Sequence, residues 1–594
     1  MFRTSPSPLA AIAAACLLTV TLPAGAAMAQ KSKSKAKAEA TETFTAPEVT
    51  VDIPEIVAVD SSVDEATLRK IFSGDPDGNV SALADLSASS IDIPELSILA
   101  QFEVDGESSE STFTITDINL TDVTDGVAAS ASIGAMDIST DDRSSFTFGT
   151  LEVTDLSISA LIGIHGLAQG GDSGMQTLYS SFTSEGGTLT APEAECTINE
   201  FSGSEVRVRP LSFSPAEFFT LVEQLDAAGD EPPPELLGQA LRMYAEVLTF
   251  VEAGPMSFGG YDCTFDEGQQ FTVAIGAGEA DAFSAGQYPT VSLSDIEIDG
   301  GDEGYFTIGN FTVKGVDLNN VVAALEAAPD AVDETWLDAN ARRLIPEFGG
   351  LSIADVSIDI PDAEAPGNSI TGSLGLFDLT LGNYRNGIPA DIAARLKNLM
   401  VDLPEDSEEE SVQQLIAMGI TTIDAGFNLA LAWNEATNTI DVGDISVSAE
   451  NLATLALAGT ITNATAGLFD LDLDKVEAAA MALAVSNLQL ELDDAGLSDI
   501  IIDQVAAEQN ATAADLRTVF AGVAQGTILG QLATAANAQQ VAQAVSDFVK
   551  GTATTLRIEL VAKEQPGVDL GDLLAAEDDP TALLEKVEVS AEAN

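Results

Sequence analysis

The stretch LSIADVSI at residues 351–358 belongs to an eight-residue pattern that recurs along the chain and decides its fold. The first, third, sixth and eighth residues of the pattern are apolar, and the fifth is acidic in seven of eight copies. The copies are IDIPELSI (91–98), FTITDINL (113–120), LEVTDLSI (151–158), VSLSDIEI (291–298), FTVKGVDL (311–318), LSIADVSI (351–358), LGLFDLTL (374–381) and IDVGDISV (440–447). Because apolar and polar residues alternate within each copy, the pattern predicts strands of an antiparallel sheet with one solvated face.

The fifth position of the pattern has a structural explanation. The apolar residues change from odd to even positions across it, so a β-bulge or a tight corner must reset the face of the strand there. Aspartate and glycine suit either conformation, and Gly315 replaces the acid in one copy. We therefore interpret the recurring acids as structural residues, because a metal ion needs several carboxylates at one point and a sheet spaces its repeats apart.

Segments with helical spacing are expected to cover the apolar side of this sheet. Ile392, Leu396 and Leu399 in PADIAARLKNLM follow the spacing i, i+4, i+7, and the run 497–549 is rich in helix-forming residues. The sequence thus predicts an α+β fold class: extended antiparallel, bulged β-sheet repeats with helical hairpin insertions and a helix-rich C-terminal region.

The chain divides into four predicted segments. Residues 1–29 contain an apolar run followed by the small-residue site AMA, which is typical of a signal peptide, and residues 30–45 form a flexible basic linker. Residues 46–365 are a repetitive β-rich domain with a helical hairpin at 214–252, where Ser214 is the N-cap and Pro215 the first helical residue. Residues 366–594 are a second α+β domain, helix-rich from about residue 473.

Export and charge limit the possible partners. No later stretch approaches the roughly 20 apolar residues of a membrane span, so we expect a periplasmic or extracellular protein without a transmembrane span. The 95 acidic and 23 basic residues give a net charge of -72, which excludes nucleic acid as a partner because phosphate binding needs a positive surface. Such a charge is best tolerated where salt or divalent cations screen it.

Two cysteines remain after removal of the predicted signal peptide. Cys196 lies in ECTINEF and Cys263 in YDCTFDE, two similar strand-like stretches on either side of the predicted helical hairpin. In an oxidising compartment a Cys196–Cys263 disulfide is the natural expectation. Two separate buried thiols are the alternative.

The sequence nominates no catalytic, cofactor or metal site. The loop at 72–86 resembles a calcium loop through Asp75 and Asp77, but Ser73 and Ala84 stand where its first and last ligands belong. The single histidine, His165, is too little for a histidine-based zinc site, and the GDSG at 171–174 is best explained as a surface turn. No phosphate loop or dinucleotide motif is present.

The repeated strand pattern, as in GGLSIADVSIDI at 349–360, resembles that of Gram-negative envelope proteins of the AsmA and YdgA kind. The closing stretch, a helix-rich run followed by TTLRIELVAKEQPGVDLGDLL and PTALLEKVEVSAEAN, is similar to the ends of uncharacterised exported acidic bacterial proteins. The resemblance implies a long curved sheet whose apolar face holds lipid. We expect a non-catalytic periplasmic or envelope-associated protein that binds an apolar ligand such as lipid or scaffolds an envelope component. The alternatives are an acidic surface protein bridged by divalent cations and, less favoured, a carboxylate-dependent hydrolase.

Overall fold

The computed structural model divides the chain into two compact units. It describes residues 48–594 except for 74–81, 84, 105–106, 141–143, 165–173, 214, 230–231, 267–269, 362–368, 405–406, 408, 534 and 574–579. Unit 1 comprises the described residues up to Glu200 together with Val208–Pro232, and unit 2 comprises Phe201–Arg207 and Pro233–Asn594. The boundary predicted between residues 365 and 366 therefore falls inside unit 2, where the strands before and after it pair with each other.

Unit 1 is built on an antiparallel sheet whose long central strands pair with each other. They are β3 (Ala88–Val104) and β4 (Glu107–Thr124). Further strands are β1 (Glu48–Asp52), β2 (Val57–Val59), β5 (Val127–Ile133), β6 (Ala135–Thr140), β7 (Ser145–Phe148), β8 (Leu151–Ser157), β9 (Gln176–Ser184), β10 (Gly187–Ala191) and β11 (Ala194–Ile198). Its helices include α2 (Glu65–Phe72), α4 (Ile158–Ile164) and α5 (Pro215–Ala228).

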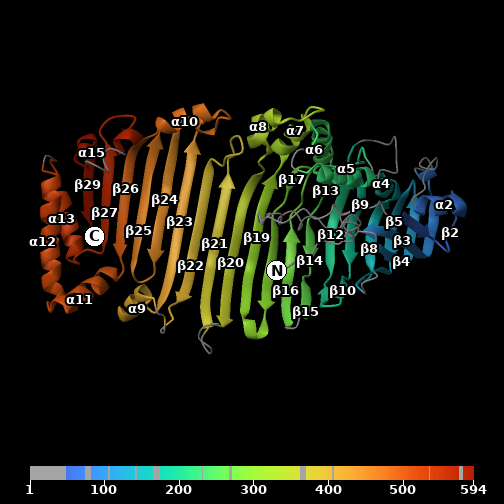
Figure 1. The fold of residues 1–594 in the computed structure, drawn as a ribbon, viewed down its shortest axis with the longest axis horizontal. Coiled ribbons are helices and arrows are strands. Elements are labelled where there is room, and N and C mark those ends of the chain that lie inside the picture. Colours follow the sequence, from blue (N-terminus) through green and yellow to red (C-terminus); the bar gives the residue numbers. More distant parts are fainter. Residues whose placement is uncertain are drawn as a thin grey trace. The chain divides into compact units, whose positions relative to one another are not determined.

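Unit 2 contains a longer antiparallel sheet in which strands that follow each other in sequence lie side by side (Figure 1). These strands are β18 (Val291–Asp299), β19 (Tyr305–Asp317), β20 (Glu347–Pro361), β21 (Ser369–Gly382), β22 (Asp391–Asp402), β23 (Thr422–Asn434), β24 (Thr439–Ala449), β25 (Ala453–Thr462) and β26 (Ala484–Asp494). Before them come β12 (Phe201–Val208), β13 (Val251–Ala253), β14 (Met256–Phe258), β15 (Tyr261–Asp266), β16 (Gln270–Ala280) and β17 (Gln287–Tyr288), and after them β27 (Thr555–Ala562), β28 (Val568–Asp569) and β29 (Val587–Ala593).

The helices of unit 2 connect the strands. Between strands lie α6 (Pro234–Val247), α7 (Asn319–Glu326), α8 (Glu334–Asn340), α9 (Glu410–Ala417), α10 (Leu473–Met481) and α15 (Pro580–Lys586). A helical segment between β26 and β27 contains α11 (Leu497–Gln509), α12 (Ala513–Gln531) and α13 (Ala538–Val549), as predicted for residues 497–549. Helices α5 and α6 occur where the sequence predicts helices, while the predicted cap Ser214 lies outside the described residues.

A row of residues crosses the sheet of unit 2 where most of its strands reset their face, and we call this row the crease; β23 continues the row through Gly426 without a reset of its own. Asp295, for example, lies between the ladder pairs Ser294–Asn310 and Ile296–Ile308, so that it stands opposite Gly309. The crease consists of Gly276, Asp295, Gly309, Asp355, Gly375, Asn398 and Gly426, one residue from each of β16 and β18–β23. Aspartate or asparagine therefore alternates with glycine from strand to strand.

Backbone geometry explains this alternation. Asp295, Asp355 and Asn398 have φ angles of 52°, 55° and 51°, in the left-handed region that aspartate and asparagine tolerate better than most residues. A Cβ atom on Gly309 would lie 2.9 Å from the Cβ atom of Asp355, closer than side chains approach. Glycine on the neighbouring strand thus makes room for the left-handed residue.

The structure confirms that the pattern resets the face of each strand, and it corrects which residue does so. Asp117, Asp155, Asp295 and Asp355 are left-handed, as the interpretation of the fifth position requires. Glu95 and Asp378 stay in regular pairs, because Pro94 and Gly375 are the unpaired residues of their strands. In β24 the register shifts between Val442 and Asp444, around Gly443, whereas Gly315 is skipped between the ladder pairs Lys314–Gly350 and Val316–Phe348.

The prediction of a helix at PADIAARLKNLM is wrong, because these residues lead into and form strand β22. Ile392 and Leu396 are separated by two steps of strand alternation, and Leu396 and Leu399 flank the crease residue Asn398. The reset adds one residue to the ordinary spacing of two. A creased strand therefore reproduces the spacing i, i+4, i+7 that is typical of a helix.

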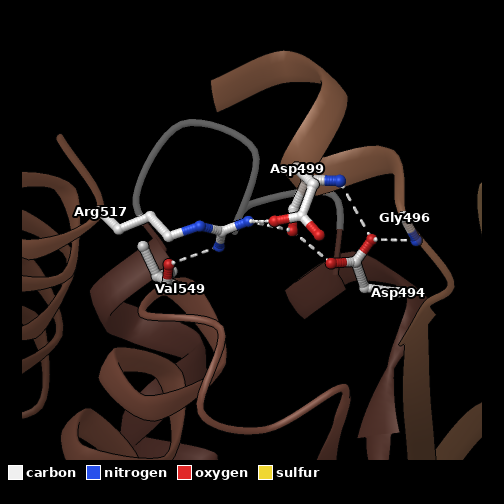
Figure 2. A network of polar contacts seen from close by, with 6 residues as sticks. Asp494, Gly496, Asp499, Arg517 and Val549 are labelled. Atoms are coloured by element: carbon white, nitrogen blue, oxygen red, sulfur yellow. Dashed lines mark hydrogen bonds and ion pairs between the residues drawn. The ribbon is translucent and has the colours of Figure 1, made fainter. Parts of the chain in front are cut away.

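A network of polar contacts joins the end of β26 to α11, α12 and α13 (Figure 2). Arg517 donates from Nη2 to Asp499 Oδ1 at 2.5 Å and to Ser498 Oγ at 3.0 Å, and from Nη1 to the carbonyl oxygen of Val549 at 3.3 Å. Only 13% of the Arg517 side chain is exposed. Burial raises the pKa of Asp494, but hydrogen bonds from Ser498 and Gly496 and the charge of Arg517 outweigh it and lower the pKa below its usual value. The network fixes the helices to the sheet.

Candidate apolar ligand-binding face

The apolar face of the unit 1 sheet is covered by its own chain. Ile91 and Ile93, before the reset in β3, and Leu96, after it, belong to one buried core. Leu68 and Ile71 of α2 pack in the same core and are 0% and 3% exposed. In unit 1 the apolar residues on both sides of the reset thus share one face, and a helix closes that face.

In unit 2 the corresponding apolar residues form rungs that run across the strands. Cross-strand partners lie on the same side of a sheet, so each rung can be followed through the ladder pairs. Four rungs cross the strands from β18 onward, two on each side of the crease. The first two are Val291, Val313, Leu351, Leu379, Ala394, Leu429, Ile445 and Leu457, and Leu293, Phe311, Ile353, Phe377, Leu396, Phe427, Val447 and Leu455. The other two are Ile296, Ile308, Val356, Leu374, Leu399, Ala425, Ala449 and Ala453, and Ile298, Phe306, Ile358, Gly372, Val401 and Ile423.

All four rungs lie on one side of the sheet. On β23 the rung residues Ile423, Ala425, Phe427 and Leu429 alternate without interruption, so they share a face. Their partners on β22 continue this face to both sides of Asn398. We call the surface formed by the four rungs the apolar face.

The apolar face is open in the described structure. None of its residues is buried, and Val447 and Leu455 on neighbouring strands are 57% and 47% exposed. In Figure 1 the helices α7, α8, α9 and α10 lie at the strand ends, and no labelled helix crosses β19–β25. The same rungs continue into Leu556 and Ile558 of β27, where α13 and residues near it cover them in a hydrophobic core.

The opposite face of these strands is polar and has its own hydrogen bonds. Lys314 Nζ donates to Asp378 Oδ2 at 2.7 Å, and Asn428 accepts from Arg395 at 3.2 Å. Burial raises the pKa of Asp378, but the hydrogen bond and positive charge of Lys314 are the main causes that bring it below its usual value. The sheet is therefore amphipathic, with charge on one side and hydrocarbon on the other.

The apolar face is large for a surface that stays in water. Eight strands spaced by about 4.8 Å span roughly 34 Å, and the four rungs extend roughly 20 Å along the strands. Monomeric proteins rarely expose continuous apolar patches of more than a few hundred Å² without using them for binding. One hydrocarbon chain of a membrane lipid spans about 15 Å, half of the bilayer core. The face can hold such a chain along its full length.

The predicted site residues lie elsewhere. Cys196 in β11 and Cys263 in β15 are both disulfide-bonded. Asp75, Asp77 and Ala84 of the calcium-loop motif fall outside the described residues, as do His165 and most of the GDSG motif. Within the part of the chain that the structure describes, no three His, Cys, Asp or Glu side chains are grouped closely enough to hold a metal ion.

Two further observations concern catalysis and membranes. The pKa of Glu450 is raised because it shares a hydrogen bond with Asp424 and is repelled by its charge. This carboxyl group is fully exposed, whereas a catalytic acid is expected in a cleft.

No described helix combines the length and the apolar composition that crossing a bilayer requires.

Several residues of the apolar face are missed by the sequence patterns. Helical spacing places Leu396 and Leu399 in a helix, and FNLALAW at 427–433 does not match the eight-residue pattern. The alternation of Phe427 with Leu429 and Leu431 is the signal that identifies β23.

Comparison with known proteins adds one match. No curated protein and no solved structure matches the chain. The model of a family described as "Uncharacterized protein" matches residues 446–594, from the end of β24 to the C-terminus.

Proposed function

We propose that this protein is a non-catalytic periplasmic or envelope-associated protein that binds the hydrocarbon chain of a lipid on the apolar face of unit 2. The observation that carries the proposal is the contrast between the two units. The same sequence pattern is closed by α2 in unit 1 and left open in unit 2, although α13 covers its continuation at β27. Burying apolar area stabilises a complex by roughly 25 cal/mol per Å², so an uncovered face of this size favours an apolar partner.

A lipid chain suits the face better than a folded protein partner. The rungs consist of aliphatic and phenylalanine side chains and one glycine, without a tyrosine, tryptophan or arginine. Those three residue types are the usual anchors of protein–protein interfaces. A hydrocarbon chain needs no polar partner and lies across several rungs without leaving a hydrogen bond unsatisfied.

Binding can be tested with a pair of substitutions on the most exposed rung. Val447→Ser and Leu455→Ser together remove apolar atoms from two paired positions that are already half exposed, so the fold should persist. Val561→Ser is the matched control. Val561 is 39% exposed and lies on the side of β27 opposite to Leu556 and Ile558, which continue the rungs. We expect the double variant to bind monododecanoylglycerol at least about tenfold more weakly than the native protein, a loss of about 1.4 kcal/mol.

The measurement is a calorimetric titration of the full chain below the aggregation concentration of the amphiphile. The V561S variant should bind like the native protein. Absence of binding to the native protein, or equal affinities for all three proteins, would overturn the proposal. Native mass spectrometry of protein purified from its own cells provides an independent check, since a lipid adduct should survive in the native chain and be depleted in the double variant.

Export is part of the same proposal and is supported by the composition of residues 1–29. N-terminal sequencing of the protein from a periplasmic fraction should give Gln30 as the first residue. A chain that begins at Met1 in the cytoplasmic fraction would contradict it.

A further inference from the structure

Positive charge is almost absent around the apolar face. The 232 residues from 243 to 474 contain six basic residues, namely Lys314, Arg342, Arg343, Arg385, Arg395 and Lys397. Lys314 pairs with Asp378 and Arg395 with Asn428 on the polar face, and Lys397, two residues beyond Arg395 on the same strand, lies on that face as well. None of the six belongs to a rung.

The remaining three basic residues lie at one set of strand ends, where each of them contacts another group of the protein. Arg385 forms an ion pair with Glu435 at 2.8 Å. Arg342 donates to the carbonyl oxygen of Asp470, and Arg343 donates to Asn340 Oδ1 at 3.4 Å.

The other set of strand ends is acidic. It begins with the turn between β18 and β19, which contains Asp302 and Glu303 in the short helix Gly301–Glu303, and it includes Glu410 at the start of α9. The described residues that form or flank these ends, 295–305, 355–361, 369–371, 399–404, 409–424 and 448–454, include no lysine or arginine. At these ends a hydrogen bond between the side chains of Glu450 and Asp424, together with the negative charge of Asp424, raises the pKa of Glu450.

This inference rests on the proposed function and names the class of ligand. We infer that the apolar face selects amphiphiles whose head group carries no negative charge, and that it rejects anionic lipids with the same hydrocarbon chain. A chain that lies parallel to the strands, across the rungs, places its head group at one set of strand ends, and the set without a cation is the acidic border. An anionic head group at the acidic border meets carboxylates and no cation, whereas an uncharged head group meets no repulsion.

The test compares probes with the same chain length. The native protein is titrated with monododecanoylglycerol, which is uncharged, and with dodecanoate, which is anionic, at 20 mM and at 500 mM NaCl. We expect the uncharged probe to bind at least tenfold more tightly at low salt. The ratio should fall below about threefold at high salt, where the Debye length shrinks to less than 5 Å.

A charge reversal at the border provides the second arm. Glu450→Lys should increase the affinity for dodecanoate at low salt and leave the affinity for monododecanoylglycerol unchanged. Glu559→Lys, on the polar side of β27, is the matched control and should leave both affinities unchanged.

The outcomes separate the two proposals. If dodecanoate binds the native protein as tightly as monododecanoylglycerol, or if E559K acts like E450K, the head-group inference is wrong while lipid binding stands. If neither probe binds the native protein, or if the V447S/L455S double variant binds both probes as the native protein does, the proposed function fails as well.

Discussion

Replacing Asp355 by valine should destabilise unit 2 because of the backbone conformation of this residue and not because of a lost contact. Asp355 has a φ angle of 55° in the middle of β20. The left-handed conformation costs an ordinary L-residue about 1–2 kcal/mol and is worst for β-branched side chains, while aspartate tolerates it. We therefore expect Asp355→Val to lower the free energy of unfolding by about 2 kcal/mol.

The assay is urea denaturation followed by tryptophan fluorescence, which reports on unit 2 because Trp336 and Trp433 are the two tryptophans of the chain. Asp359→Val is the matched control in the same strand, since Asp359 is in regular ladder pairs and exposed. It should change the free energy by no more than about 0.5 kcal/mol.

A third variant distinguishes the effect of the left-handed backbone from the effect of losing the carboxylate. Asp355→Gly removes the carboxylate but adopts a positive φ without strain, so it should be nearly as stable as the native protein. If D355V and D359V unfold at the same urea concentration, or if D355G is as unstable as D355V, the explanation of the crease is refuted.

Three further outcomes follow from contacts and charge. Arg517→Met should lower the free energy of unfolding by about 2 kcal/mol in urea denaturation, and Arg517→Lys should recover part of the loss, because the hydrogen bonds of a mostly buried guanidinium are replaced incompletely. The pKa of Asp378 is lowered in the folded protein, so its contribution to stability is complete above the ordinary aspartate pKa of 3.8 and is lost as the pH falls through the lowered value. The stability difference between the native protein and Lys314→Met should therefore shrink between pH 5 and pH 3, and a constant difference would contradict the pairing. Raising NaCl from 50 mM to 500 mM should increase the melting temperature, because the net charge of -72 repels itself, and a decrease in differential scanning fluorimetry would contradict this.

Local patterning was sufficient to predict the strands and the need for a reset within them. The apolar positions on each side of Asp295 and Asp355 are short-range information, and a change of parity requires a bend wherever the chain pairs. The partner of the bend is not local. That Gly309 faces Asp355 depends on the pairing of β19 with β20, which a single stretch of sequence does not contain.

The helix predicted around Leu396 failed for a related reason. An alternating strand with one added residue has the same spacing as one face of a helix, and the alanine-rich composition of ADIAARLKNLM favours a helix. Its neighbours β21 and β23 override that preference by pairing along most of β22. Tertiary pairing and not propensity determines the conformation here.

That the apolar face is left uncovered could not be predicted from the sequence. The pattern predicts apolar residues on one side of the sheet, and the helices needed to cover them are present in the chain. Where those helices go depends on connection lengths and on contacts such as those of Arg517, which fix α12 and α13 near β27 and leave β18–β25 uncovered.

The alternation of Asp or Asn with Gly along the crease also limits how such a sheet can change in size over evolution. Each left-handed residue needs a glycine at the facing position of the neighbouring strand. Inserting a single strand with aspartate or asparagine at its crease position would therefore place two bulky crease residues next to each other. Duplication or loss of a whole β-hairpin keeps the alternation intact. Homologues of different length should therefore differ in this region by even numbers of strands, and the width of their apolar face should change in steps of about 10 Å.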